Sequence, residues 1–295
     1  MTGAMLKFFF TIITLVILSS VFLFNFLRPL VPQIVPQKIL FTPVYESTPL
    51  SCQTSFHHPS PPLDFNFKAD KTAISKQIIW HYQQLQFFIH DVEIHTELNG
   101  WQPWSMTTNS HQANDVALLG EVCTEATQEQ YWALELIPLT STKDITDIRF
   151  TLGLPFSLNH LNPLTQPSPL NVSSMFWVWQ GGHKFMRIEL VSPADNWLFH
   201  LGSTGCRASS PIRAPKNECL QPNRILMSMP FPHNSNNITL DLAVLLNDLH
   251  LTKNHSCQSS PKNKHCKKLF KNLGIATKQY QQITDQMLFK VSQNE

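Results

Sequence analysis

Residues that could bind a metal or undergo oxidation gather in one stretch of the sequence. Three histidines, His160, His183 and His200, lie in it, together with two tryptophans, Trp177 and Trp179, that one residue separates. Neutral imidazole nitrogens suit copper, and two or three of them with an open position make a copper site. This combination predicts a metal site held by a β scaffold.

Each residue of this stretch, Leu152–Arg224, also has a purely structural interpretation. A W-x-W pair in a strand directs both side chains to one face, where tryptophans usually belong to the core. The nitrogen lone pair of an indole belongs to the ring, so Trp177 and Trp179 would need oxidation before either could bind a metal. A single histidine more often makes hydrogen bonds than binds a metal. The residue types alone therefore favour an exported metal-binding β protein only as a hypothesis.

Catalytic motifs do not appear in the sequence. The segment Ser203–Cys206 does not match G-x-S-x-G, and no Gly-x-Gly-x-x-Gly or P-loop pattern occurs. Asp91 and Glu93 share a face of a predicted strand, but a solvated polar face explains them more simply. A hydrolase built from scattered residues is the least supported alternative, and we expect the protein not to be an enzyme.

The composition favours strands over long helices. Of the 295 residues, 42% are hydrophobic and 14% charged, and the chain contains 21 prolines and 20 phenylalanines. Helical bundles need charged outer faces, whereas aromatic residues and prolines suit strands joined by turns. The formal net charge is +2, so nucleic acid is not an expected partner. We expect a mainly β fold, an antiparallel β-sandwich with short C-terminal helices.

Short β-prone segments separated by turns give the expected strands. Leu85–Leu98 is followed by an Asn-Gly hairpin turn, and Ser174–Gln180 and His183–Val191 form a second hairpin about a Gly-Gly turn. Pro155–Pro169 is rich in proline and predicts a long ordered loop. The other expected strands are Trp101–Met106, Val116–Val122, Tyr131–Ile137, Thr146–Leu152, Trp197–Gly202, Ile225–Met229 and Ile238–Leu240.

Two short helices follow the strands. Asp241–Leu249 begins with an N-cap residue, and Lys264–Leu273 is followed by a glycine that suits a C-cap. Residues 276–295 are expected to form a helical, peripheral tail.

The N-terminal region predicts export. Phe8–Leu27 is an apolar run of about twenty residues, long enough to span a bilayer. A cleaved signal peptide is the alternative, but the run is long and no small-x-small cleavage site follows it. We expect residues 1–28 to be an anchor, 29–62 a Pro-rich linker and 63–275 the exported domain. The domain would lie on the periplasmic face of the inner membrane, or in the periplasm if the segment is cleaved.

The linker contains two adjacent histidines, His57 and His58. Histidines in such a flank are more often solvated than metal-bound, so we expect both to face water.

Six cysteines in an exported chain predict three disulfides. The sequence does not determine their connectivity. Cys206 and Cys219 enclose a short loop, so local pairing is sterically easy, and the same holds for Cys257 and Cys266; Cys52 and Cys123 are then left for each other. Zinc bound by thiolates would need closer Cys-x-x-Cys spacings, which the sequence does not contain.

Several phrases of the sequence, read in order, resemble one family. Over roughly Pro49 to Ile275, the sequence resembles the MbnP-like periplasmic copper-binding proteins. These are also described as the four-Cys, W-x-W metallo-mystery pair family. The phrases are FFIHDVEI at Phe87–Ile94, VALLGEVC at Val116–Cys123, RFTLGLPFSLNHLNP at Arg149–Pro163, PLNVSSMFWVWQGGHKFMRIEL at Pro169–Leu190, FHLGSTGC at Phe199–Cys206, C-x-x-PNR at Cys219–Arg224 and CQSSPKNKHCKKLFKNLGI at Cys257–Ile275.

The resemblance implies a copper site that matures by oxidation. Members of the family are secreted or membrane-tethered and are paired with a MauG-like di-haem cytochrome c peroxidase, which oxidises a W-x-W tryptophan to kynurenine. Kynurenine carries an arylamine and a ketone that can join histidines at copper. Here the oxidised residue would be Trp177 or Trp179, and the ligands His160 and His200. The resemblance also assigns the four family cysteines to Cys206, Cys219, Cys257 and Cys266.

The sequence departs from the family pattern at His183 and at the N-terminus. His183 stands where an aromatic residue such as Tyr is expected; it is a candidate additional ligand or a polar residue of the turn, and we favour the second. Residues 1–28 resemble a retained anchor, whereas many relatives have a cleavable or lipoprotein signal. The alternative to an exported copper-binding protein is a disulfide-stapled β domain that serves as an adhesion or assembly module without metal.

Overall fold

The computed structural model describes residues 35–60, 76–123, 128–139, 141–178, 180–232, 235–275 and 287–292. The predicted anchor, residues 1–28, lies outside these ranges. Within them, no helix is both long enough and apolar enough to cross a membrane. The strands and helices of the described ranges belong to one compact unit, Pro36–Glu295.

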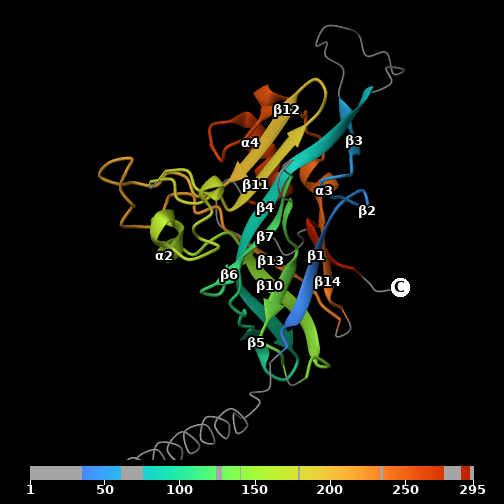
Figure 1. Cartoon of the computed structure of the whole chain (residues 1–295), viewed down its shortest axis with the longest axis vertical. Coiled ribbons are helices and arrows are strands. Elements are labelled where there is room, and N and C mark those ends of the chain that lie inside the picture. The colour runs from blue at the N-terminus through green and yellow to red at the C-terminus, as the bar shows by residue number, and fades with distance from the viewer. Residues whose placement is uncertain are drawn as a thin grey trace, which may run out of the picture. The chain divides into compact units, whose positions relative to one another are not determined.

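The described chain is mainly β and forms two open sheets (Figure 1). Its smaller sheet is five-stranded, with the strand order β15-β14-β1-β2 and with β9 also paired to β1. Strands β1 and β14 run parallel, which departs from the fully antiparallel arrangement we expected. The smaller sheet comprises β1 (Gln37–Tyr45), β2 (Thr48–Pro49), β9 (Ala133–Leu136), β14 (Asn237–Asp241) and β15 (Phe289–Val291).

The larger, ten-stranded sheet is organised around one long strand, β4 (Lys76–Thr96). At Asp91, where φ is 50°, the strand bulges, and its register against the neighbouring strand shifts. The predicted strand Leu85–Leu98 is therefore the second half of a longer element. The remaining strands are β3 (Phe56–Ser60), β5 (Gly100–Pro103), β6 (Gln112–Ala113), β7 (Val116–Cys123), β8 (Gln128–Tyr131), β10 (Ile145–Leu152), β11 (Met186–Val191), β12 (Asn196–Leu201) and β13 (Ile225–Pro230).

In the part of the chain that the structure describes, helices are few and short. The two predicted after the strands are confirmed: the Asp241 side chain accepts a hydrogen bond from the Ala243 N–H, and the Asn263 side chain accepts one from the His265 N–H. The helices are α2 (Phe156–Asn159), η1 (Pro163–Thr165), η2 (Ser173–Met175), α3 (Leu242–Leu246), η3 (Lys253–His255) and α4 (Lys264–Asn272).

Aromatic side chains join the two sheets. Phe41 of β1 contacts Phe87 of β4 and Phe150 of β10, with ring centroids 5.9 and 5.7 Å apart. Phe289 of β15 contacts all three rings, at 5.2 to 6.1 Å. All four side chains are buried, and most of the rings meet edge to face, the favourable arrangement for aromatic pairs.

Two predicted boundaries need correction because of this core. Residues 36–60 were expected to be linker, yet they form β1, β2 and β3. In β1 the alternation of buried Ile39 and Phe41 with exposed Leu40 is a strand pattern that proline content obscured. The tail was expected to be helical and peripheral, but β15 pairs with β14 and buries Phe289; residues 276–286 lie outside the described ranges.

The two histidines of the supposed linker also differ from each other. His57 is exposed, as expected, whereas His58 is buried. The Tyr45 hydroxyl hydrogen-bonds to His58 Nδ1 at 3.0 Å, and His58 Nε2 contacts the Leu249 carbonyl oxygen at 2.9 Å. The expectation that His58 faces water is therefore wrong, because β3 pairs with β4 and turns this side chain inward.

All six cysteines are paired. The disulfides are Cys52–Cys123, Cys206–Cys219 and Cys257–Cys266. This confirms the local pairings that short loops favoured and the long-range pair that remained.

Another strand prediction, Tyr131–Ile137, proves to be two strands. Residues up to Tyr131 pair with β7 in the larger sheet, and Ala133–Leu136 pairs with β1 in the smaller one. Trp132 lies between them. The chain thus crosses from one sheet to the other within a single apolar segment, which no local pattern distinguishes from one strand.

Candidate metal site

The segment that carries the W-x-W motif is not a strand. Residues Ser173–Met175 form the short helix η2, and beyond it only a single bridge joins Phe176 to His183. The carbonyl oxygen of Ser174 accepts hydrogen bonds from Lys184 Nζ and Arg187 Nη1 at 2.6 and 3.0 Å. The N–H groups of Met175 and Phe176 donate to the carbonyl oxygens of Val172 and Ser173, at 3.0 and 3.1 Å, as in a 3-10 turn and not a strand. The predicted strand Ser174–Gln180 is wrong for this reason.

The Gly-Gly turn itself is present. The N–H groups of Gly181 and Gly182 both donate to the Val178 carbonyl, at 2.7 and 2.8 Å, and Gly182 has a φ of 73°. The Trp177 N–H donates to the Gly182 carbonyl at 3.0 Å. Trp179 lies outside the described residues, so only Trp177 can be placed.

Trp177 is half-buried, and its indole lies against the backbone of Gly202. A Cβ atom built on Gly202 would lie 2.5 Å from Trp177 Cζ3 and 2.9 Å from the His183 carbonyl oxygen. On Gly181 a Cβ would lie 3.4 Å from the same indole, an ordinary contact distance. Gly202 is therefore the position that must lack a side chain for the indole to lie where it does.

Replacing Gly202 by alanine is expected to displace the indole and lower the free energy of unfolding by about 1–3 kcal/mol, the usual cost of overpacking. Urea unfolding and the tryptophan emission spectrum measure the two effects. Gly181→Ala, which adds the same methyl group near the same indole without a close contact, is the matched control. Equal effects of the two substitutions would contradict the role given to Gly202.

Asn159, which sequence analysis missed, links His160 with His183. The His183 N–H donates to Asn159 Oδ1 at 2.9 Å, which orients the amide so that Nδ2 faces His160 Nε2 at 3.1 Å and Ser203 Oγ at 3.3 Å. All four side chains are buried. No local pattern marks Asn159, because its partners come from three separate segments.

His183 has little capacity left for a metal. Its Nδ1 faces the Asn159 carbonyl oxygen at 2.7 Å, and its Nε2 faces the Leu170 carbonyl oxygen at 3.0 Å. Burial lowers the pKa of this fully buried imidazole. Since both ring nitrogens face carbonyl oxygens, neither points toward an open position.

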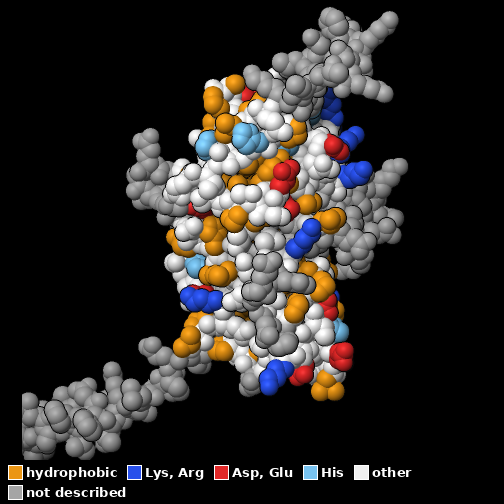
Figure 2. All heavy atoms as spheres, turned by 90° about the vertical axis from the view of Figure 1, so that its right-hand side faces the viewer, with side chains coloured by type: hydrophobic (Ala, Val, Ile, Leu, Met, Phe, Trp, Pro, Cys, Tyr) orange, Lys and Arg blue, Asp and Glu red, His pale blue; other side chains and the backbone are white. Residues whose placement is uncertain are grey.

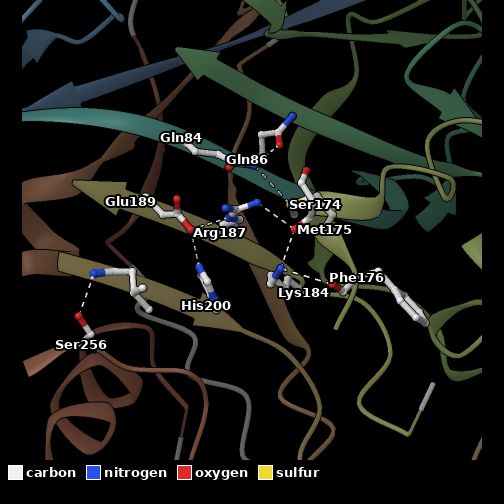
Figure 3. Close-up of polar contacts among 11 residues, drawn as sticks. Gln84, Gln86, Ser174, Met175, Phe176, Lys184, Arg187, Glu189, His200 and Ser256 are labelled. Atoms are coloured by element: carbon white, nitrogen blue, oxygen red, sulfur yellow. Dashed lines mark hydrogen bonds and ion pairs between the residues drawn. The ribbon is translucent and has the colours of Figure 1, made fainter. Parts of the chain in front are cut away.

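His200 has the opposite arrangement (Figure 3). Its Nε2 lies 2.9 Å from Glu189 Oε1, whereas its Nδ1 is buried and has no hydrogen-bond partner. Burial lowers the pKa of His200, so the ring is neutral near pH 7. With Nε2–H donating to the carboxylate, the lone pair lies on Nδ1. A histidine held by a carboxylate in this way is a common form of metal ligand.

Glu189 stays ionised whether or not His200 carries a proton. Its pKa is lowered to about 2, first by the hydrogen bond from His200 and then by that from Arg187. Arg187 Nε lies 2.7 Å from the same oxygen, Oε1. The guanidinium of Arg187 is the cation beside this carboxylate, and it adds to the effect of the His200 hydrogen bond. Sequence analysis missed Glu189, although the alternation in β11 places Arg187 and Glu189 on one face.

The strands bring the Trp177 segment and His200 to the same face of the larger sheet. His200 of β12 pairs with Arg187 of β11. Arg187 and Lys184 both donate to the Ser174 carbonyl and so tie η2 to this face (Figure 3). Gly202, which contacts the indole, follows His200 by two residues, just beyond the end of β12. Burial lowers the pKa of Lys184 to about 8.

No closed cage of metal ligands exists among the described residues. Two sets of three ligand atoms lie within 4.8 Å of one another, and they combine a disulfide with His160 or with Glu121. Disulfide sulfurs are not thiolates, so neither set is a metal site as it stands. His160, His183 and His200 do not form such a set. Each of them is connected to residues near Trp177 by its own contacts: His160 through Asn159, His183 through its carbonyl oxygen near Gly202, and His200 through Glu189 and Arg187.

Comparison with known proteins identifies relatives. A family model described as MbnP matches residues 35–259. Among solved structures the chain is similar to MbnP from Methylosinus trichosporium, with a TM-score of 0.70 and 20% sequence identity over 87% of this chain and 97% of that one. This likeness shows the fold. No curated protein matches the chain.

Proposed function

This chain belongs to the MbnP family, and on that premise we propose that it is an exported, non-catalytic copper-binding protein that handles or stores copper. The observation that carries the proposal is the buried Nδ1 of His200, which has no hydrogen-bond partner. A neutral imidazole nitrogen suits copper. Glu189 holds the ring by its other nitrogen, as an orienting partner does at metal sites.

His160 and an oxidised tryptophan complete the proposed ligand set. The tryptophan is Trp177 or Trp179, after conversion to kynurenine. Trp177 is half-buried beside Gly202 and so is accessible from solvent. His183 is not included, because both of its ring nitrogens face carbonyl oxygens. Bound copper would be the cargo of the protein, held by imidazole and arylamine nitrogens.

A MauG-like di-haem cytochrome c peroxidase is the proposed maturation partner. Hydrogen peroxide supplies the oxidising equivalents. The C2–C3 bond of the indole breaks, each of these two carbons gains an oxygen, and hydrolysis then releases C2 as formate. The product has a ketone on the side chain and a free arylamine on the ring.

Export is supported by the three disulfides, which persist in oxidising compartments. We propose that residues 1–28 anchor the domain to the periplasmic face of the inner membrane, or that the domain is periplasmic if this segment is cleaved. A disulfide-stapled adhesion module would share this location but would bind no copper.

Co-expression with the peroxidase tests the proposal. We expect the mass of the peptide containing Trp177 and Trp179 to change as conversion to kynurenine requires, and roughly one copper per chain to be bound. The peptide containing Trp80 is the internal control, because that indole is buried in the core and should not change. An unmodified peptide at full copper occupancy would remove the maturation step, and oxidised protein without copper would remove the binding function.

A further inference from the structure

A second group of histidines lies around the N-terminus of α4. His255 is the last residue of η3, His265 is on the first turn of α4, and His250 lies between α3 and η3. The ring centroids of His250 and His255 are 5.5 Å apart, and those of His255 and His265 are 4.1 Å apart with the rings stacked. All three are half-buried. Histidine side chains also gather near the upper end of the face shown in Figure 2.

The backbone holds His255 and His265 in place. The Cys257–Cys266 disulfide joins the two segments, two residues after His255 and one residue after His265. Trp197 Nε1 donates to the His255 carbonyl oxygen at 3.3 Å. The Asn263 side chain accepts from the His265 N–H at 2.8 Å. The closeness of the two rings is therefore built into the fold.

One nitrogen of this group has no partner. His255 Nδ1 is buried and has no hydrogen bond, and a buried polar atom without a partner costs free energy unless something binds to it. The only other described side chains in this condition are His111 and His200. A neutral imidazole carries a lone pair on one of its two ring nitrogens, and that nitrogen can bind a metal.

We propose that His250, His255 and His265 bind a divalent transition-metal ion of the copper or zinc class, at a site separate from His200. Imidazole nitrogens are the ligands that these ions accept most readily in proteins. His255 supplies the buried nitrogen, and His265, half-exposed on the helix, turns its ring from the stacked position to add a second. His265 lies beyond the residues that the family model matches, 35–259, so the site is a property proposed for this chain.

Calorimetric titration of the metal-stripped full-length protein with Zn²⁺, and separately with Cu²⁺, tests the proposal. In the His200→Ala variant we expect one equivalent of metal still to bind. Adding His255→Ala and His265→Gln to that variant is expected to abolish this binding. The same variant carrying His57→Ala, an exposed histidine of β3, is the matched control and should bind as before. Absence of binding in His200→Ala alone, or binding that survives the added substitutions, overturns the proposal.

Single substitutions distinguish the loss of a metal ligand from the loss of the folded structure. His250→Gln and His265→Gln each remove one half-exposed ring and leave the Cys257–Cys266 disulfide intact. Each is expected to weaken Zn²⁺ binding by at least about 10-fold, with circular dichroism and thermal midpoint unchanged. An unaltered Kd in either well-folded variant overturns the three-histidine site. Because His200 is intact here, failure of this test leaves the copper proposal at His200 unaffected.

Discussion

Replacing His200 by alanine is expected to weaken copper binding by more than about 100-fold, since the substitution removes a proposed ligand outright and not only an orienting group. The physical basis is the buried Nδ1, which has no hydrogen-bond partner, opposite the Nε2 held by Glu189. Copper affinity, measured by competition with a chromophoric chelator on protein matured with its peroxidase, reports the effect.

Glu189→Gln tests whether holding the His200 ring in its orientation matters for copper affinity while His200 itself is still present. Glutamine keeps the size of the side chain but loses the charge that favours the Nε2–H tautomer, so copper affinity should fall by about 10- to 100-fold. His57→Ala changes an exposed histidine and should leave the affinity unaltered. If His200→Ala binds copper as tightly as His57→Ala, then His200 is not a ligand, whatever the tryptophan oxidation state.

Removing the Cys52–Cys123 disulfide is expected to lower the free energy of unfolding by about 4 kcal/mol, on the loop-entropy model. The bond spans 71 residues of sequence and joins the turn between β2 and β3 to the end of β7. A cross-link across so long a loop restricts the unfolded chain strongly. Urea unfolding of the Cys52→Ala, Cys123→Ala double variant measures the loss.

The Cys206–Cys219 pair provides the comparison, because it spans only 13 residues. The same model gives about 3 kcal/mol for its removal. This short disulfide lies next to His160, with Cys219 Sγ 3.6 Å from His160 Nε2. Its loss should therefore also weaken copper binding, whereas loss of Cys52–Cys123 should not. A smaller stability loss for the 71-residue loop than for the 13-residue loop would contradict the entropic account.

Features that depend on neighbouring residues were predictable from the sequence. The N-cap at Asp241, the helix of α4 and the hairpin turn before Gly100 are all observed where the local pattern indicates them. The two short-loop disulfides follow from the same logic. In each case the atoms that form the interaction are close in the sequence, at most 13 residues apart, so local chain geometry favours the contact.

Features that depend on distant pairing were not predictable. Strand β1 pairs with β14, which lies almost at the other end of the chain, and Phe289 of the supposed tail completes the aromatic contacts with Phe41. A Pro-rich segment and a polar tail carry too weak a local pattern to reveal this. Their strands form because a sheet edge made elsewhere supplies the hydrogen bonds and the apolar surface.

At the candidate site, too, the residue types could be read from the sequence and their contacts could not. The sequence by itself singled out His160, His183, His200 and the tryptophans as candidate site residues, because imidazole and indole chemistry is a property of residue type. Only the tertiary structure decided what each one can do. Both ring nitrogens of His183 face carbonyl oxygens, whereas the buried Nδ1 of His200 has no hydrogen-bond partner.

The same applies to the tryptophan segment. The W-x-W motif could be read from the sequence, but not that the residues before it form η2, where the N–H groups of Met175 and Phe176 donate to the carbonyl oxygens of Val172 and Ser173. Lys184 and Arg187, which follow the Gly-Gly turn, bind the Ser174 carbonyl of this helix. Hydrogen-bond partners of this kind are assigned by folding, so the identity of a site residue is readable in sequence while its free lone pairs are not.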